Sequence, residues 1–481
     1  MYARRRTCFL LFNWLKNIIS GDIMKYGKLT NVAIFILIAA AVFQTGKLWL
    51  ENTESRNFFS FYSSVRKEIK DTDKNYDIIE PEKIVVGYGN KKFDMLYSGE
   101  KGNSIVSLCE KVINDVFLSG SFVKTESINW EAYIEGKAVI MKYPFYVSSG
   151  EYMKGYGISN SAFSESVKSI NYIVVAPGSG SSESTYCYFI DGSTSEAYIF
   201  MLNGSESPSA LYNAIQNMQY SDDDSMEYIS TVQSGMNIFD SIYVPQWTEG
   251  EYKYNPIKVS SPFMSETGEF DRNKLSECVN NFFDNYVSGE DASNVNNIYT
   301  FSNDNVVVKY YDNGVLEYYN YDIGAADEEQ SLSSAYTISE SFIERDKMIT
   351  PDLYLSGVET RNDGLVFYYD YAVNNIPVKF SDETEEKLGM NHAVEVVVSN
   401  GNVKRYKRYI ADFKADESTV CTINVDMISA WDNAIMNYAG SEDVTSISDM
   451  FIGYYLDTQD KMDIKWFTMV NGSTIVGETY K

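Results

Sequence analysis

The chain has 481 residues, with 40 Lys and Arg against 67 Asp and Glu, five Cys and a single His. Its formal net charge of −27 argues against a nucleic-acid-binding surface, because phosphate binding draws its affinity from clustered Lys and Arg. The single histidine, His392, excludes a metal site built from several histidines. At roughly 150 residues per domain, the length predicts about three domains.

The charges are distributed unequally about one apolar segment. Seven of the 40 basic residues and one of the 67 acidic residues lie at or before Lys47, so the remainder holds 33 basic against 66 acidic residues. Residues 29–46 carry no charge and are continuously apolar from Val32 to Phe43. Eighteen helical residues span roughly 27 Å, which is near the lower limit for crossing a bilayer core. We therefore predict a transmembrane anchor over residues 29–50.

The basic residues before the anchor orient the protein in the cell membrane. By the positive-inside rule, residues 1–28 form a basic cytoplasmic leader and the acidic body lies outside the cytoplasm, in a single-pass arrangement. A cleaved signal peptide is the alternative, but the small residues Ala39 to Ala41 lie inside the apolar run and not after it. Met24 also precedes a basic leader of ordinary length, so it is an alternative start to Met1.

Two groups of residues are candidates for contact with partner proteins. In the predicted anchor, small side chains permit close helix approach and polar ones can hydrogen-bond a neighbouring helix; these are Ala39, Ala40, Ala41, Gln44 and Thr45. The alternative for the two polar residues is that they merely approach the membrane interface. In a predicted juxtamembrane helix over residues 51–74, spacings of 4, 3 and 4 form one apolar face, of Phe58, Tyr62, Val65 and Ile69. This face packs either on a partner helix or on the chain's own body.

Four segments of the body have the apolar spacing of amphipathic helices. They cover residues 104–117 behind a cap at Asn103, a segment that begins at the Ser207-Pro208 pair, residues 271–286, and residues 426–438. For the last helix, the predicted buried face consists of Ile428, Trp431, Ile435 and Tyr438. A weaker helix is predicted over residues 339–346.

Between these helices the apolar period changes to two, and Asn-Gly pairs interrupt the runs. Asn-Gly between alternating runs predicts a hairpin, because both central residues of a type I′ turn need positive φ. The pairs are Asn203-Gly204, Asn313-Gly314, Asn400-Gly401 and Asn471-Gly472. Helices alternating with hairpins predict an α+β fold, in which helices pack on antiparallel sheets. We divide the body into domains of residues 75–259, 260–350 and 351–481.

Motif searches indicate no catalytic, cofactor-binding or metal-binding residues. No G-x-S-x-G elbow, phosphate-binding loop or calcium loop is complete. His392 is either an ordinary residue at the start of a strand, which we favour, or a pH-sensing group. Cys109, Cys187, Cys278 and Cys421 permit disulfides outside the cytoplasm, but their wide separation favours buried thiols.

The organisation of the chain resembles the YycH family of regulators of two-component systems. The resemblance rests on the basic leader, an anchor that ends at Lys47-Leu48-Trp49-Leu50, and a large body of helices and hairpins. It extends to the run LVFYYDYAVNNIPVKF (Leu365 to Phe380), the hairpin at Asn400-Gly401 and the final DMFIGYYLD (Asp449 to Asp457).

This resemblance implies a non-catalytic accessory protein without a cofactor. Its partners would be a WalK-like sensor histidine kinase that controls cell-wall metabolism in Gram-positive bacteria, and a YycI-like protein. Coupling would pass through the transmembrane helix and the outer domains. An anchored module that binds a wall polymer or peptide is the alternative, with aromatic residues of the sheets as stacking faces. A wall hydrolase that uses paired carboxylates is a further alternative.

Overall fold

The computed structural model describes residues 78–480, apart from 98–99, 159–160, 181, 220–225, 233–242, 248–250, 266–267, 284–292, 296–297, 325–329, 346–351, 439–442 and 458–460. Tyr76–Lys481 form one compact unit. The predicted leader, anchor and juxtamembrane helix, with every predicted partner-contacting residue, lie outside the described residues. Among the described residues, no helix has the length and apolar character to cross a bilayer. The three-domain division stays a prediction.

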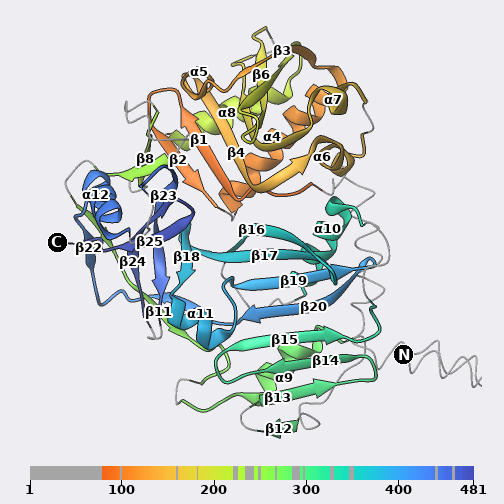
Figure 1. Ribbon diagram of the computed structural model, residues 1–481, viewed down its shortest axis with the longest axis vertical. Coiled ribbons are helices and arrows are strands. Elements are labelled where there is room, and N and C mark those ends of the chain that lie inside the picture. The colour runs from red at the N-terminus through yellow and green to blue at the C-terminus, as the bar shows by residue number, and fades with distance from the viewer. Residues whose placement is uncertain are drawn as a thin grey trace, which may run out of the picture. The chain divides into compact units, whose positions relative to one another are not determined.

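The first half of the body is an antiparallel sheet, which in the described residues has nine strands (Figure 1). In spatial order they are β3 (Ser121–Ser127), β7 (Glu196–Leu202), β6 (Thr185–Asp191), β5 (Ser169–Ala176), β4 (Lys137–Ser148), β1 (Lys83–Tyr88), β2 (Phe93–Leu96), β8 (Glu227–Ser230) and β9 (Tyr243–Gln246). Every residue of β1 is buried, as expected for the apolar sequence KIVVGY in an interior strand, whereas the edge strand β3 is almost wholly exposed.

Helices α4 (Glu100–Ser119) and α8 (Ser207–Gln219) pack against each other and against this sheet. The apolar stripe predicted for α4 is confirmed, since all its members are buried or half-buried: Ile105, Leu108, Cys109, Val112, Ile113, Val116 and Phe117. The cap predicted at Asn103 is wrong, because the helix begins at Glu100 and Asn103 lies within its first turn. The shorter helices of this half are α5 (Trp130–Tyr133), α6 (Ser149–Gly155) and α7 (Ser161–Ser166).

The second half is a larger sheet, of fourteen strands in the described residues. Its spatial order is β12 (Ser293–Val295), β13 (Ile298–Ser302), β14 (Val306–Tyr310), β15 (Val315–Asn320), β20 (Asn402–Tyr409), β19 (Val394–Ser399), β17 (Gly364–Val373), β18 (Ile376–Phe380), β23 (Ile447–Leu456), β24 (Lys461–Val470), β11 (Ile257–Ser260) and β21 (Asp412–Ala415). Two further strands join it at the side, β16 (Asp352–Arg361) on β17 and β25 (Ser473–Gly477) on β24. The pair β18–β23 is parallel, and β10 (Tyr252–Tyr254) pairs separately with β22 (Cys421–Ile423).

Four helices accompany the second sheet: α9 (Arg272–Asn280), α10 (Leu332–Ile343), α11 (Asp382–Leu388) and α12 (Met427–Asn437). Asp271 and Asp426 cap α9 and α12 by accepting hydrogen bonds from backbone N–H groups of the first turn. The helix predicted over residues 339–346 exists as α10, which begins seven residues earlier. The helix predicted over residues 271–286 ends at Asn280, although Phe282 and Phe283 are buried as expected.

The face predicted for α12 is partly right, because Trp431 and Tyr438 are half-buried against the core, but Ile428 and Ile435 are not part of the packed side. Ile428 is 61% exposed and Ile435 is 37% exposed, whereas Ala430 and Ala434 are buried. The helix contacts β24 and β25. Small side chains permit such close contact with a sheet, so the alanines face the strands and the larger aliphatic residues face solvent.

Three of the four predicted Asn-Gly turns join paired strands. Asn400-Gly401 joins β19 to β20, and Asn471-Gly472 joins β24 to β25, with positive φ at both residues of each pair. The pair at 313–314 joins β14 to β15, with positive φ at Gly314 alone. The hairpin predicted at 203–204 is wrong, because these residues connect β7 to helix α8. There the helix-initiating Ser207-Pro208 pair follows too closely for another strand.

The described cysteines are free thiols. Cys109, Cys187 and Cys278 are buried and Cys421 is half-buried, so the interpretation as buried thiols holds for three of the four. Burial raises the pKa of Cys109 and Cys187, which keeps these thiols protonated and unreactive at neutral pH.

Candidate functional site

Polar groups of the two large sheets meet inside the body, in a region that we call the junction. Asp449 of β23 forms ion pairs with Lys83 of β1 and with Lys142 of β4, the latter at 3.5 Å. The side chains of Lys83 and Asp449 are only 7% and 14% exposed. Burial alone raises the pKa of Asp449, but the two ammonium groups outweigh burial and hold it well below its usual range. The carboxylate is therefore charged at neutral pH and joins two sheets.

A second group at the junction is Asn375, in the turn between β17 and β18. Both residues of this turn have positive φ, 51° at Asn374 and 60° at Asn375. The Asn375 side chain accepts a hydrogen bond of 2.9 Å from the backbone N–H of Tyr97 and donates one to the carbonyl of Met95. One carboxamide thus satisfies two backbone groups beside β2, which otherwise would be left without partners in the protein interior.

Asp370 of β17 lies in a related network. It forms an ion pair of 2.8 Å with Lys379 of β18, and its other oxygen lies 3.2 Å from Nδ1 of His392. Burial raises the pKa of Asp370, but the Lys379 charge and the histidine contact lower it by more. His392 also lies 3.1 Å from the Ser356 hydroxyl and packs on the Tyr368 ring. His392 thus joins the Asp370 network two residues before β19 begins, and both interpretations of this histidine stay predictions.

A residue of helix α6, which packs with the first sheet, caps the N-terminus of α10, which packs with the second sheet. The α10 cap residue, Ser331, makes no capping hydrogen bond with its own side chain. Instead Glu151 of α6 accepts hydrogen bonds from the Ser331 hydroxyl at 2.7 Å and the Leu332 N–H at 3.0 Å. The Ser333 hydroxyl donates to the Glu151 carbonyl at 3.0 Å. The carboxylate also suits the positive end of the helix dipole, so α10 depends on a residue 180 positions earlier in the chain.

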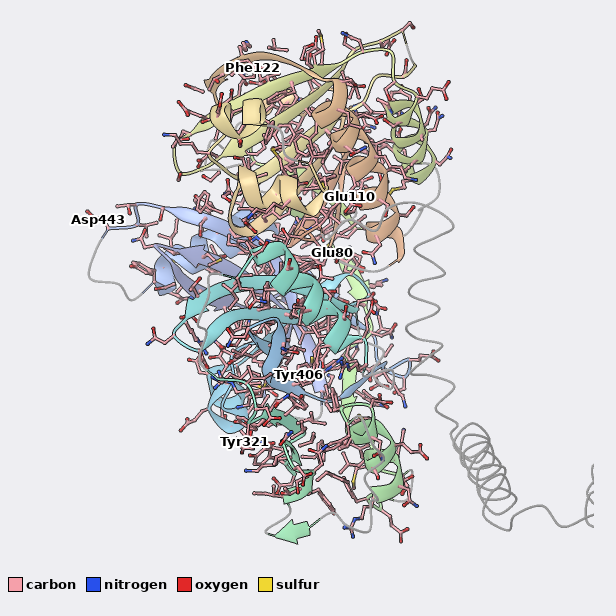
Figure 2. The ribbon with its side chains drawn as sticks, turned by 90° about the vertical axis from the view of Figure 1, so that its right-hand side faces the viewer. Glu80, Glu110, Phe122, Tyr321, Tyr406 and Asp443 are labelled. Atoms are coloured by element: carbon pink, nitrogen blue, oxygen red, sulfur yellow. The ribbon has the colours of Figure 1, made fainter. Side chains whose placement is uncertain are left out.

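Three carboxyl groups from three different elements gather beside these contacts. They are Glu80, which precedes β1, Glu110 of α4 and Glu340 of α10; Figure 2 shows the first two, and Glu80 repels both of the others. Burial and repulsion by Glu80 raise the pKa of Glu110 to about 7. For Glu340, burial is again the largest cause and repulsion by Glu80 the next, and its pKa rises to about 8 although tyrosine hydroxyls donate to it. Burial and repulsion by Glu344 raise the pKa of Glu80 as well.

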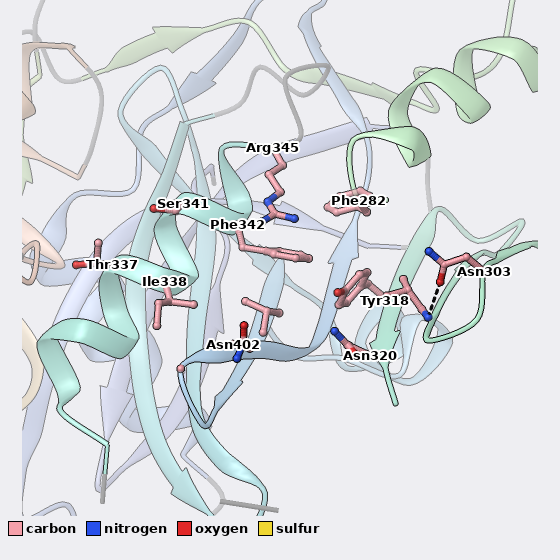
Figure 3. Close-up of a pocket in the computed structure, with 13 residues that line it drawn as sticks. Phe282, Asn303, Tyr318, Asn320, Thr337, Ile338, Ser341, Phe342, Arg345 and Asn402 are labelled. Atoms are coloured by element: carbon pink, nitrogen blue, oxygen red, sulfur yellow. Dashed lines mark hydrogen bonds between the residues drawn. The ribbon is translucent and has the colours of Figure 1, made fainter. Parts of the chain in front are cut away.

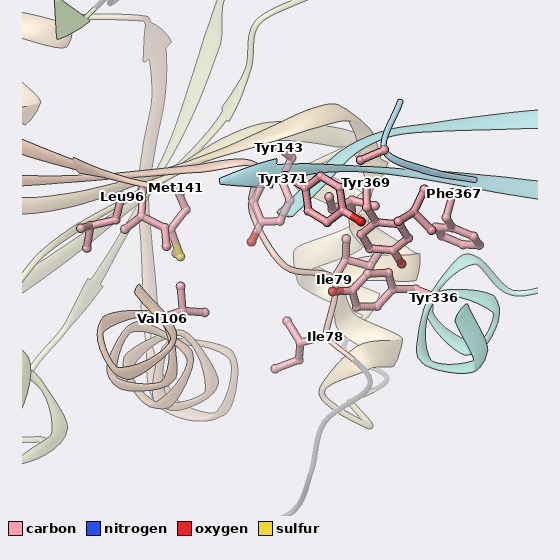
Figure 4. Close-up of a cluster of buried hydrophobic side chains, with 14 of the residues drawn as sticks. Ile78, Ile79, Leu96, Val106, Met141, Tyr143, Tyr336, Phe367, Tyr369 and Tyr371 are labelled. Atoms are coloured by element: carbon pink, nitrogen blue, oxygen red, sulfur yellow. The ribbon is translucent and has the colours of Figure 1, made fainter. Parts of the chain in front are cut away.

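The segment that carries Glu80 is held by apolar packing. Ile78 and Ile79 are buried, 9% and 2% exposed. Figure 4 shows them between α4, which carries Val106, and α10, which carries Tyr336. The Tyr336 hydroxyl is also hydrogen-bonded to the backbone of Glu80. Any displacement of this segment therefore disturbs helices that belong to both sheets.

The junction therefore combines buried ion pairs between the two sheets, a helix cap supplied from one sheet to the other and carboxyl groups whose pKa is raised. Within the described ranges, no group of three or more His, Cys, Asp or Glu side chains is arranged to hold a metal ion. Apart from His392, for which pH sensing was the less favoured alternative, no residue of these networks is predicted from the sequence to be functional. The residues predicted to contact partners, from Ala39 to Ile69, lie outside the described residues.

Comparison with known proteins identifies the fold. No family model matches the chain, and no curated protein matches its sequence. Among solved structures, the crystal structure of YycH from Bacillus subtilis matches with a TM-score of 0.51 and 11% sequence identity. The match covers 84% of this chain and 97% of that chain. The YycH-like fold expected from the sequence is thereby confirmed, as is the α+β class.

Proposed function

We propose that this chain is a membrane-anchored, non-catalytic regulator that acts outside the cytoplasm on a sensor histidine kinase. The observation that carries the proposal is the fold, which matches nearly the whole of YycH from Bacillus subtilis. The resemblance seen in the sequence implies the same role, with a WalK-like kinase and a YycI-like protein as partners. A basic leader before an apolar segment, followed by an acidic body, supports the proposed orientation.

The proposed mechanism is a shift between two arrangements of the kinase helices. The body binds a partner, and the predicted anchor contacts the kinase through residues such as Ala40 and Gln44. The junction supports this scheme because the segment Ile78 to Glu80, which leads back toward the predicted anchor, contacts helices of both sheets. A partner that changes how the sheets pack would thereby change the position of that segment.

The test is co-purification from membranes with the native sensor kinase. We expect the full chain to capture the kinase, and a variant with residues 29–50 replaced by an unrelated spanning segment to capture much less. Ala40→Leu, which blocks close helix approach, should also reduce capture, whereas the matched control Ile38→Leu should not. The proposal fails if no form captures the kinase and deletion of the gene leaves wall-stress signalling unchanged.

A further inference from the structure

A cavity of about 390 Å³ lies between α10, strands β14 and β15, and the turn from β19 to β20 (Figure 3). Its floor is aromatic. Phe282, Tyr318 and Phe342 are buried there, with ring centroids 4.8 to 6.2 Å apart. Tyr406 packs behind Phe282 and Phe342 and supports the floor. The volume falls in the lower part of the range of roughly 300–1,000 Å³ that is typical of small-molecule sites.

A positively charged side chain, that of Arg345, lies over the aromatic floor. The Arg345 guanidinium lies 5.0 Å from the centroid of the Phe342 ring, and Figure 3 shows the side chain extending from the end of α10 over that ring. Among the described residues, Arg345 forms no ion pair with a carboxylate. The ring orients the guanidinium without using its N–H donors, so the contacts of the described residues leave those donors to a ligand.

Carboxamides on the rim of the cavity are oriented by their backbone contacts. The Asn303 oxygen accepts from the N–H groups of Asn305 and Val306, at 3.1 and 2.8 Å, so its NH₂ group is the part left to donate. The Asn320 oxygen likewise accepts from the Asp322 N–H. The rim of the cavity therefore presents two amide donors besides the guanidinium.

The Asn402 carboxamide is oriented the other way and presents an acceptor to the cavity instead of a donor. Its NH₂ donates to the carbonyl of Asn400 at 3.1 Å, which leaves its oxygen as an acceptor on the rim. A single ligand would satisfy all these groups if it placed an anionic group beside Arg345, an apolar part on the rings and an N–H group toward Asn402. A carboxylate suits the forked guanidinium because two parallel N–H bonds can form.

We propose that this cavity binds the C-terminal residue of a short peptide, with its free carboxylate on Arg345 and its apolar side chain on the aromatic floor. The proposal does not depend on regulation of a kinase, since it concerns binding to the body alone. In a body with a large excess of acidic residues, an arginine that pairs with no carboxylate among the described residues favours an anionic ligand.

The test uses N-acetyl-glycyl-phenylalanine and its C-terminal amide as probes, with the full chain in detergent and affinity measured by calorimetry. We expect the acid to bind at least tenfold more tightly than the amide, because a charge-assisted bidentate contact is lost in the amide. Arg345→Gln should weaken the acid about tenfold and leave the amide unchanged. The matched control Arg361→Gln removes a charge on β16 and should change neither affinity.

A second variant tests the location independently of charge. Ser341 is exposed on α10 at the rim, so Ser341→Trp should fill the cavity and abolish binding of both probes without unfolding the protein. Circular dichroism verifies that each variant is folded. Failure of the wild-type protein to bind the acid at millimolar concentration overturns the proposal. Equal affinities for acid and amide, or an unchanged affinity in Arg345→Gln, overturn it as well.

Discussion

Asp449 shows how a single side chain contributes to the body. It lies in β23, 366 residues after its partner Lys83, and both side chains are almost completely buried. Removing a charge from a buried pair leaves the other charge without compensation, which usually costs more than the pair itself contributes. The junction is therefore sensitive to loss of one partner and more tolerant of loss of both.

We expect Asp449→Asn to destabilise the protein by about 3–5 kcal/mol, because Lys83 and Lys142 then lose their shared carboxylate. The double variant Asp449→Asn with Lys83→Met should recover part of this loss, since the buried ammonium is removed as well. Urea denaturation of the three proteins at neutral pH measures both effects. Equal stability of the wild type and Asp449→Asn would show that the pair contributes nothing.

Among the elements, α12 shows the difference between an apolar pattern and a packed face. Its sequence carries a spaced row of large apolar residues and, on another face, the alanines that pack on β24 and β25. The whole row was predicted to be buried; the structure half-buries Trp431 and Tyr438 against the core, leaves Ile428 and Ile435 exposed and buries the alanines. Apolar spacing identifies the helix correctly, whereas the distance to the sheet decides which face fits.

The two faces of α12 should respond differently to substitution. We expect Ala434→Leu to cost about 1–3 kcal/mol, because three added carbons must be placed in a packed contact. Ile428→Ser should change stability by less than about 0.5 kcal/mol, because Ile428 is 61% exposed. Thermal unfolding compares them directly. A larger loss of stability for Ile428→Ser than for Ala434→Leu would show that α12 packs through the isoleucine side, as the sequence predicts.

At the scale of the whole molecule, the carboxyls of the junction make stability depend on pH. The pKa of Glu340 is about 8 and that of Glu110 about 7, against 4.5 for the ordinary side chain. The folded protein therefore retains protons that the unfolded chain releases. The stability from this difference is complete below about pH 4.5 and is lost as the pH rises to 7 or 8. Asp370 and Asp449, whose pKa is lowered, act in the opposite sense and only at acid pH.

Glu340→Gln removes one of these ionisations while keeping the shape of the protonated side chain. We expect the variant to match the wild type near pH 5 and to exceed its stability by about 1–3 kcal/mol at pH 8.5, since each pKa unit corresponds to about 1.4 kcal/mol. Glu395→Gln, on β19 and outside the three-carboxyl group, is the control. Parallel pH profiles for Glu340→Gln and the wild type would contradict the assignment.

Local signals in the sequence determined much of the secondary structure and little of the site. The turn at Asn400-Gly401 was predictable because positive φ is a local requirement that few residues meet. For the hydrogen bonds between Asn375 and the backbone beside β2, the sequence offered one signal, because an Asn-Asn pair between two apolar runs indicates a turn. The strand that this turn contacts could not be inferred from the pair. The cap supplied by Glu151 left no local signal at all, since Ser331 alone looks like an ordinary cap residue.

By itself, the sequence determined the α+β class, the stripe of α4, two type I′ turns and the likeness to YycH, because periodicity, turn chemistry and charge order are properties of neighbouring residues. The tertiary structure alone decided that Asp449 meets Lys83, that Glu151 caps α10 and that Glu80, Glu110 and Glu340 lie together. Those contacts depend on the order of strands in two sheets and on how the sheets pack, and burial then sets the charge and pKa of each group.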